Sequence, residues 1–300
     1  MITAVVLLGY TLAVATVGRR ILSRLTERTT YPLLGVAAWL SACLSVVASW
    51  LLATALAAGA HLPPNAIVSA CLAVAEDTAT HPHLAIPAVS VPLAAALGLR
   101  GVWTAATGYA ADVRVRRRHL QALRLLGRAD GRLGATVLEA PEPAVYCLDG
   151  RRPTIVVTTT ALRALSDRQL AAVLDHERCH LTERHHVLVR ACRLLARAFP
   201  FLPLFTQART RVAALLEMRA DDVAARRHGP GVMAAGLAAV ASAAAPGAAL
   251  GAGGPSTVAR AARLLDPPGP GQEPRRWLLT ASAAFAAGPL VALMVPFCGA

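Results

Sequence analysis

The chain has 300 residues, of which 55% are hydrophobic and 16% are charged, and its formal net charge is +13. Soluble domains carry about 25% charged residues, so this composition indicates a chain that is partly solvated by lipid rather than a soluble domain. Every basic side chain is Arg, because the sequence contains no Lys. The Arg residues cluster beside apolar stretches, and no recognised nucleic-acid module accompanies them. We therefore predict contact with anionic membrane lipid and no direct nucleic acid binding.

Four apolar stretches are long enough to cross about 30 Å of hydrocarbon. They cover residues 2–18, 33–59, 84–104 and 277–297. The first could be a signal peptide by position, but Arg19 and Arg20 follow it and no basic residue precedes it. We therefore predict four transmembrane helices, the first of them an uncleaved anchor with its N-terminus outside.

The distribution of basic residues predicts on which side of the membrane each loop lies, because short cytoplasmic loops are enriched in Arg. The loop after the first stretch is rich in Arg, whereas residues 60–83 contain Glu76 and Asp77 and no Arg. Basic clusters also lie at both ends of the segment 111–276: Arg114, Arg116, Arg117 and Arg118 at one end, Arg275 and Arg276 at the other. We therefore expect a multi-pass cell-membrane protein with a membrane domain over 1–110, a cytoplasmic domain over 111–276, and the fourth span with the C-terminus over 277–300.

The six cysteines do not form a spaced framework. Three of them, Cys147, Cys179 and Cys192, fall in the predicted cytoplasmic domain, where we expect reduced thiols. Cys71 and Cys298 fall on the predicted outer side, and whether they pair is left open by the sequence.

The cytoplasmic segment begins with mixed secondary structure. Residues 113–128 predict a basic helix, and three short runs predict strands, at 135–138, 144–148 and 154–159. A helix over about 166–185 follows, because Ser166 and Gln169 have the spacing of a capping box and apolar residues continue at helical spacing. Three Arg on the apolar stretch 187–205 favour a helix in the inner membrane interface.

The helix over 166–185 contains the pentad His176-Glu177-Arg178-Cys179-His180, which has the form HExxH. Histidines four residues apart leave the same face of a helix and can bind one metal ion. Glu177 lies between them, where it can act as general base toward a metal-bound water. A catalytic zinc has three protein ligands and one open position, so a third ligand must lie elsewhere.

Two residues compete for the third position. His186 has the metzincin spacing, but that class needs a Gly three residues after the second His, where this chain has Glu183. Glu217 lies on a second predicted helix, over about 207–228, one turn before Asp221. We therefore predict a Zn²⁺ site with His176, His180 and Glu217 as ligands, and Asp221 as the acceptor for the distal N–H of a zinc-bound histidine.

These motifs carry a family resemblance. HExxH followed by an apolar stretch and by Glu217-x-x-Ala220-Asp221 resembles the integral membrane gluzincin metallopeptidases, with the BlaR/MecR type closest and the HtpX and CaaX prenyl protease families next. The resemblance implies a mainly α polytopic membrane protein with a cytoplasmic α+β gluzincin domain. One residue departs from the BlaR-like pattern, since His185 stands where that pattern often has Asp. In gluzincins a strand such as Ile155–Val157 pairs with extended substrate, although a buried core strand explains this run equally well.

The resulting functional prediction is a zinc metalloendopeptidase acting on polypeptides at the cytoplasmic membrane face. By analogy, its substrate is a cytoplasmic repressor cleaved in response to a signal. Two alternatives stay open: an HtpX-like protease for membrane-protein quality control, and a catalytically silent signalling scaffold with a structural zinc. For the oxyanion-stabilising group, the sequence offers only Arg226, Arg227 and His228 as guesses.

Overall fold

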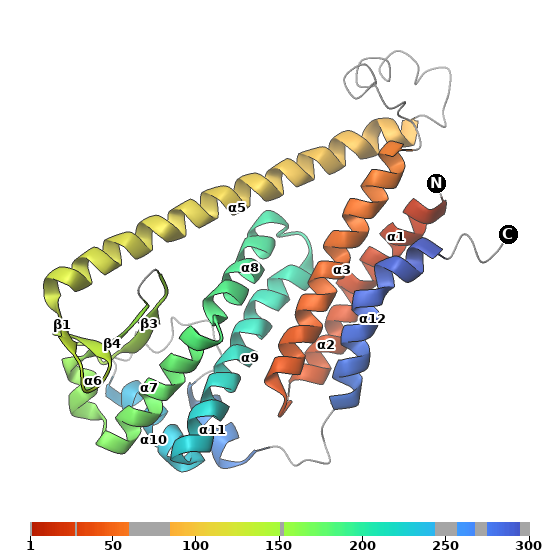
Figure 1. The fold of residues 1–300 in the computed structure, drawn as a ribbon. Coiled ribbons are helices and arrows are strands. Elements are labelled where there is room, and N and C mark those ends of the chain that lie inside the picture. The colour runs from red at the N-terminus through yellow and green to blue at the C-terminus, as the bar shows by residue number, and fades with distance from the viewer. Residues whose placement is uncertain are drawn as a thin grey trace.

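The computed structural model describes residues 2–27, 29–59, 85–150, 153–243, 257–267 and 275–294. The predicted outer loop over 60–83, together with Cys71 and Cys298, lies outside these residues. The described part is mostly helical with one small sheet (Figure 1). Its helices are α1 (Ile2–Ala13), the π-helical η1 (Val14–Gly18), α2 (Arg19–Thr26), α3 (Pro32–Gly59), α5 (Ala85–Leu126), α6 (Thr159–Ala164), α7 (Asp167–Thr182), α8 (His185–Ala198), α9 (Pro203–His228), α10 (Pro230–Ala243), α11 (Thr257–Leu265) and α12 (Arg275–Met294).

Three helical stretches in the described residues are long and apolar enough to span a membrane: Val5–Thr26, Pro32–Leu56 and Arg275–Met294. They correspond to the first, second and fourth predicted spans. The third predicted span, 84–104, is not among them. It forms the N-terminal half of α5, which continues without a break through the predicted basic helix to Leu126. Figure 1 shows α5 as a long diagonal that leaves the bundle and ends at the sheet.

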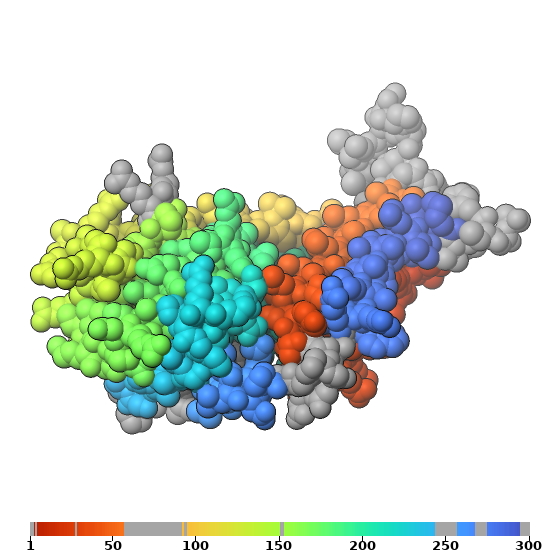
Figure 2. All heavy atoms as spheres, turned by 60° about the horizontal axis from the view of Figure 1, so that its bottom comes forward, coloured from red at the N-terminus to blue at the C-terminus, as the bar shows by residue number. Residues whose placement is uncertain are grey.

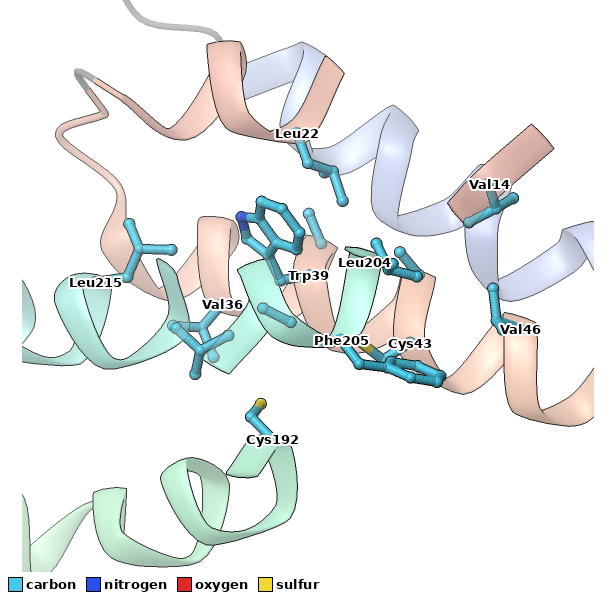
Figure 3. Close-up of a cluster of buried hydrophobic side chains, with 14 of the residues drawn as sticks. Val14, Leu22, Val36, Trp39, Cys43, Val46, Cys192, Leu204, Phe205 and Leu215 are labelled. Atoms are coloured by element: carbon cyan, nitrogen blue, oxygen red, sulfur yellow. The ribbon is translucent and has the colours of Figure 1, made fainter. Parts of the chain in front are cut away.

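Helix α9 packs against α3, so the apolar helices and the segment predicted to be cytoplasmic share one core. Leu204 and Phe205, at the start of α9, are fully buried in the same cluster as Trp39 and Cys43 of α3 (Figure 3). Farther along α9, Leu215 packs against Gly35, where an added Cβ would lie only 3.0 Å from a Leu215 methyl group. The two helices thus approach closely, and the predicted boundary at residue 110 is crossed by continuous packing.

Helix α8 runs beside α9 and reaches the far half of α3. At its end, Phe199 makes an edge-on contact with Trp50, with ring centroids 6.3 Å apart. Arg100 of α5 donates from Nε to the carbonyl of Ala198, the last residue of α8, over 2.8 Å. A basic side chain at a helix C-terminus satisfies a free carbonyl and complements the helix dipole. Helix α8 is therefore held between α5, α9 and α3.

The sheet has the strand order β1-β2-β4-β3. Its strands are β1 (Gly127–Asp130), β2 (Ala135–Leu138), β3 (Val145–Leu148) and β4 (Thr154–Thr158); the last three were predicted, and β1 was not. β4 is central, parallel to β2 and antiparallel to β3. Its Val156 and Val157 are fully buried. Pairing of Ile155–Val157 with extended substrate is therefore wrong and the alternative of a buried core strand holds, because β4 has neighbours on both sides and the edge strands are β1 and β3.

Helix α7 begins where the capping box predicted. The Ser166 side chain accepts from the backbone N–H of Gln169, and the Gln169 side chain accepts in return from the backbone N–H of Ser166. These bonds satisfy two N–H groups that the first turn of a helix leaves without partners. They fix where the helix that carries the HExxH motif starts.

We expect Ser166→Ala to lower the stability of the protein by about 1 kcal/mol, because it removes the acceptor at the helix N-cap. Ser166→Asp should retain most of the stability, since Asp is as good an N-cap residue as Ser. Thermal unfolding of the purified full chain in detergent measures both. Equal unfolding midpoints for the Ala and Asp variants would contradict the role of this cap.

Candidate metal centre

Helix α7 places the two histidines of HExxH side by side. Nε2 of His176 and Nε2 of His180 lie 3.1 Å apart, and the ring centroids are 4.8 Å apart. His176 is buried and His180 is partly buried. Both rings leave the same face because four residues on an α-helix complete little more than one turn.

Glu217 of α9 joins this pair. Its Oε2 lies 3.5 Å from Nε2 of His176, and its Oε1 lies 3.5 Å from Nε2 of His180. Zinc bonds of about 2.0–2.1 Å in a tetrahedron would separate neighbouring ligand atoms by about 3.3 Å. The three separations lie close to that value, with the two histidines facing different oxygens of Glu217, so this donor set can hold a zinc ion with one position left for water. His186 does not join this group.

Asp221, one turn after Glu217, lies behind His176. Its Oδ1 is 3.0 Å from Nδ1 of His176, although the contact is poorly aligned for a hydrogen bond. Burial alone would lower the pKa of His176, but the carboxylates of Asp221 and Glu217 outweigh burial and raise that pKa to about 9. Asp221 thus stands where it can hold the His176 ring with Nε2 toward the site, as predicted for a partner of a metal-binding histidine.

Arg260 of α11, which is mostly covered, was not predicted from the sequence. Its Nη1 lies 2.8 Å from Oε2 of Glu217. Its Nε and Nη2 form a two-pronged pair with Asp221, at 2.8 and 2.6 Å. A guanidinium that binds both carboxylates fixes their orientation and offsets their charge. Arg260 is distant from both motifs in sequence and has no pattern of its own, so only the approach of α11 to α9 reveals it.

Glu177 faces the edge strand β3. Burial raises its pKa, while the nearby His176 and then the neighbouring Cys147 of β3 act in the opposite direction. A carboxyl group with a raised pKa is better matched to proton transfer near neutral pH than an exposed one. The contact also places the edge of β3 next to the candidate general base.

The turn after α7 brings His185 rather than His186 to the site. α7 ends at Thr182, and Arg184 adopts a left-handed conformation with φ 53°, which reverses the chain before α8. Nδ1 of His185 then lies 2.9 Å from Nδ1 of His180. His186 points elsewhere and lies 3.5 Å from Asp149. The helix thus ends about three residues before the predicted limit near residue 185, and the rejection of His186 as a ligand agrees with the geometry.

Two of the residues suggested as oxyanion-stabilising groups, Arg227 and His228 at the end of α9, bind a carboxylate instead. Arg227 and His228 both bind Oδ2 of Asp175, at 3.2 and 2.9 Å, and Arg178 binds its other oxygen at 2.8 Å. These contacts tie the end of α9 to α7. Burial alone would raise the pKa of Asp175, but the hydrogen bonds from His228, Arg178 and Arg227 outweigh burial and lower that pKa to about 2. Arg227 and His228 are thus structural partners of Asp175.

Comparison with known proteins gives one match. Residues 111–214 match the family model of peptidase family M48. This stretch contains the sheet, His176, Glu177 and His180, and it ends before Glu217 and Asp221. No curated protein and no solved structure matches the chain. Over this stretch the chain is similar to peptidase family M48, and the similarity supports a metallopeptidase domain of the broad membrane gluzincin type.

Proposed function

We propose that this protein is a membrane-embedded zinc metalloendopeptidase. The observation that carries the proposal is the convergence of His176 and His180 from α7 with Glu217 from α9, at separations that suit a tetrahedral zinc. A structural site would use four protein ligands. The three-residue set, with a partly buried acid beside it, favours catalysis over the scaffold alternative.

Each group of the site has a separate role in peptide hydrolysis. Zinc, when bound, supplies a Lewis acid that polarises the scissile carbonyl and lowers the pKa of water toward about 7. Glu177 takes the proton of the attacking water and passes it to the leaving amine. Asp221 and Arg260 keep the ligands oriented.

The edge of β3 is the proposed binding surface for the substrate main chain. An extended peptide adds to a free strand edge through backbone hydrogen bonds, and Cys147 of β3 lies next to Glu177. A peptide paired with β3 would therefore run past the candidate general base. These observations favour β3 over β4 as the binding surface for the polypeptide substrate.

We further propose that the site lies on the cytoplasmic side of the cell membrane. The Arg-bearing helix α2, the end of α5 and the start of α12 at Arg275 all lie toward the side of the molecule that holds α7 and the sheet (Figure 1). The positive-inside rule assigns that side to the cytoplasm. Cleavage of a cytoplasmic repressor and quality control of membrane proteins are both compatible with this position.

Glu177→Gln tests the general base. The variant should retain one zinc ion per chain and lose cleavage by about 10²- to 10⁴-fold, because Gln keeps the size of Glu but cannot accept the proton. Zinc content and self-cleavage of the full chain in detergent are the measurements, with unfolded casein as a second substrate. Glu142→Gln, at an exposed position, is the matched control. A Glu177→Gln protein that still cleaves at the wild-type rate refutes the assignment.

Glu217→Gln tests the third ligand. Zinc should be lost together with cleavage, because a neutral amide replaces the carboxylate that completes the site. Added zinc at high concentration should restore part of the activity, since His176 and His180 remain. Elemental analysis after dialysis against a chelator, followed by zinc titration, measures both effects. Full zinc content after dialysis would show that the third ligand lies elsewhere.

A further inference from the structure

His180 has a partner on the side away from Glu217, and that partner is another histidine. Nε2 of His180 faces the candidate metal site, so a metal bound there would take Nε2 and leave the proton on Nδ1. Among the described residues, the neighbour of that N–H at hydrogen-bonding distance is Nδ1 of His185, at 2.9 Å. His185 must therefore accept through Nδ1.

The direction of this first bond fixes the next one. A neutral His185 that accepts through Nδ1 carries its proton on Nε2. Nε2 lies 3.2 Å from Oε2 of Glu183, so His185 donates to that carboxylate. His185 is only 2% exposed, which leaves little room for water to compete.

Glu183 is in turn held by Arg219 of α9. Nη2 of Arg219 lies 2.6 Å from Oε1 of Glu183, and Nε lies 3.1 Å from each oxygen. Hydrogen bonds from Arg219 are the first cause of the lowered pKa of Glu183, which keeps the carboxylate charged. The chain from His180 to Arg219 therefore has one donor and one acceptor at every step.

We propose that His185 is a positioning residue that connects the metal ligand His180 to the carboxylate of Glu183. The connection orients the His180 ring and raises the basicity of its Nε2. In many metal sites a carboxylate binds the ligand histidine directly, whereas here an imidazole is interposed. This proposal rests on the metal site proposed above.

A second metal ion is the competing explanation, because ligand atoms of Cys179, Glu183 and His185 also lie within 4.8 Å of one another. Both nitrogens of His185 already have partners, on His180 and Glu183. A cation on Glu183 would also lie beside the guanidinium of Arg219. Charge repulsion and the loss of these bonds favour the hydrogen-bonded chain.

Zinc affinity of the full chain in detergent tests the proposal, measured by competition with a chromophoric chelator. His185→Ala should weaken zinc binding by about 10- to 100-fold, the usual cost of removing the partner of a metal-binding histidine. His185→Asn should recover part of this loss, because the amide oxygen of Asn occupies nearly the position of Nδ1 and accepts from His180. His186→Ala is the matched control and should bind zinc like the wild type, since His186 contacts Asp149 instead.

Glu183→Gln tests whether the negative charge of Glu183, and not only its ability to accept a hydrogen bond, contributes to zinc binding. Gln still accepts from His185 but carries no charge, so zinc binding should weaken less than in His185→Ala and remain below wild type. The absorption spectrum of the cobalt-substituted protein should shift in His185→Ala and not in His186→Ala, because it reports ligand geometry. If His185→Ala does not fold, His185→Asn and Glu183→Gln decide the question.

The outcomes distinguish this proposal from the proposed function. Wild-type protein that binds no zinc refutes the metal site and the relay together. Wild-type protein that binds zinc, with unchanged affinity in His185→Ala, overturns the relay alone. Unchanged affinity in Glu183→Gln overturns the link from His185 to the carboxylate.

Discussion

The packing of α9 against both α3 and α7 is the constraint on which the site depends. The first half of α9 is buried against Trp39 and its neighbours on α3, and the second half carries Glu217 and Asp221 to the histidines of α7. Figure 2 shows α9, in cyan, between the green α7–α8 region and the orange α3. One rigid helix thus connects the apolar bundle to the candidate metal centre, so displacement of the bundle would move two of the acidic groups of the site.

The electrostatics of the centre follow from this packing. Glu177, Glu217 and Asp221 bring three carboxylates together, which is costly in a buried place unless positive charge offsets them. Arg260 supplies one positive charge, and a divalent cation would supply the other two. The arrangement is therefore balanced with a divalent cation and acidic without one, and the carboxylates of Asp221 and Glu217 raise the pKa of His176.

Local patterns predicted the elements that present the chemistry. The capping box gave the start of α7, alternating and β-branched residues gave three of the four strands, and helical spacing put His176 with His180 and Glu217 with Asp221 on shared faces. The sequence did not predict β1, whose residues Gly127–Asp130 have no strand composition and are held there by pairing with β2. It also did not predict that the helix ends before His185 at Arg184, because residues other than Gly rarely adopt the left-handed conformation that Arg184 has.

The sequence by itself determined the residues of the candidate site: two imidazoles one turn apart with an acid between them, and a second pair of acids one turn apart. These relations depend only on helix geometry. The tertiary structure alone decided that the two faces meet, that Arg260 binds both acids of α9, that His185 rather than His186 contacts His180, and that β3 rather than β4 borders Glu177. Such contacts join residues far apart in the chain or depend on one turn, and no local periodicity records them.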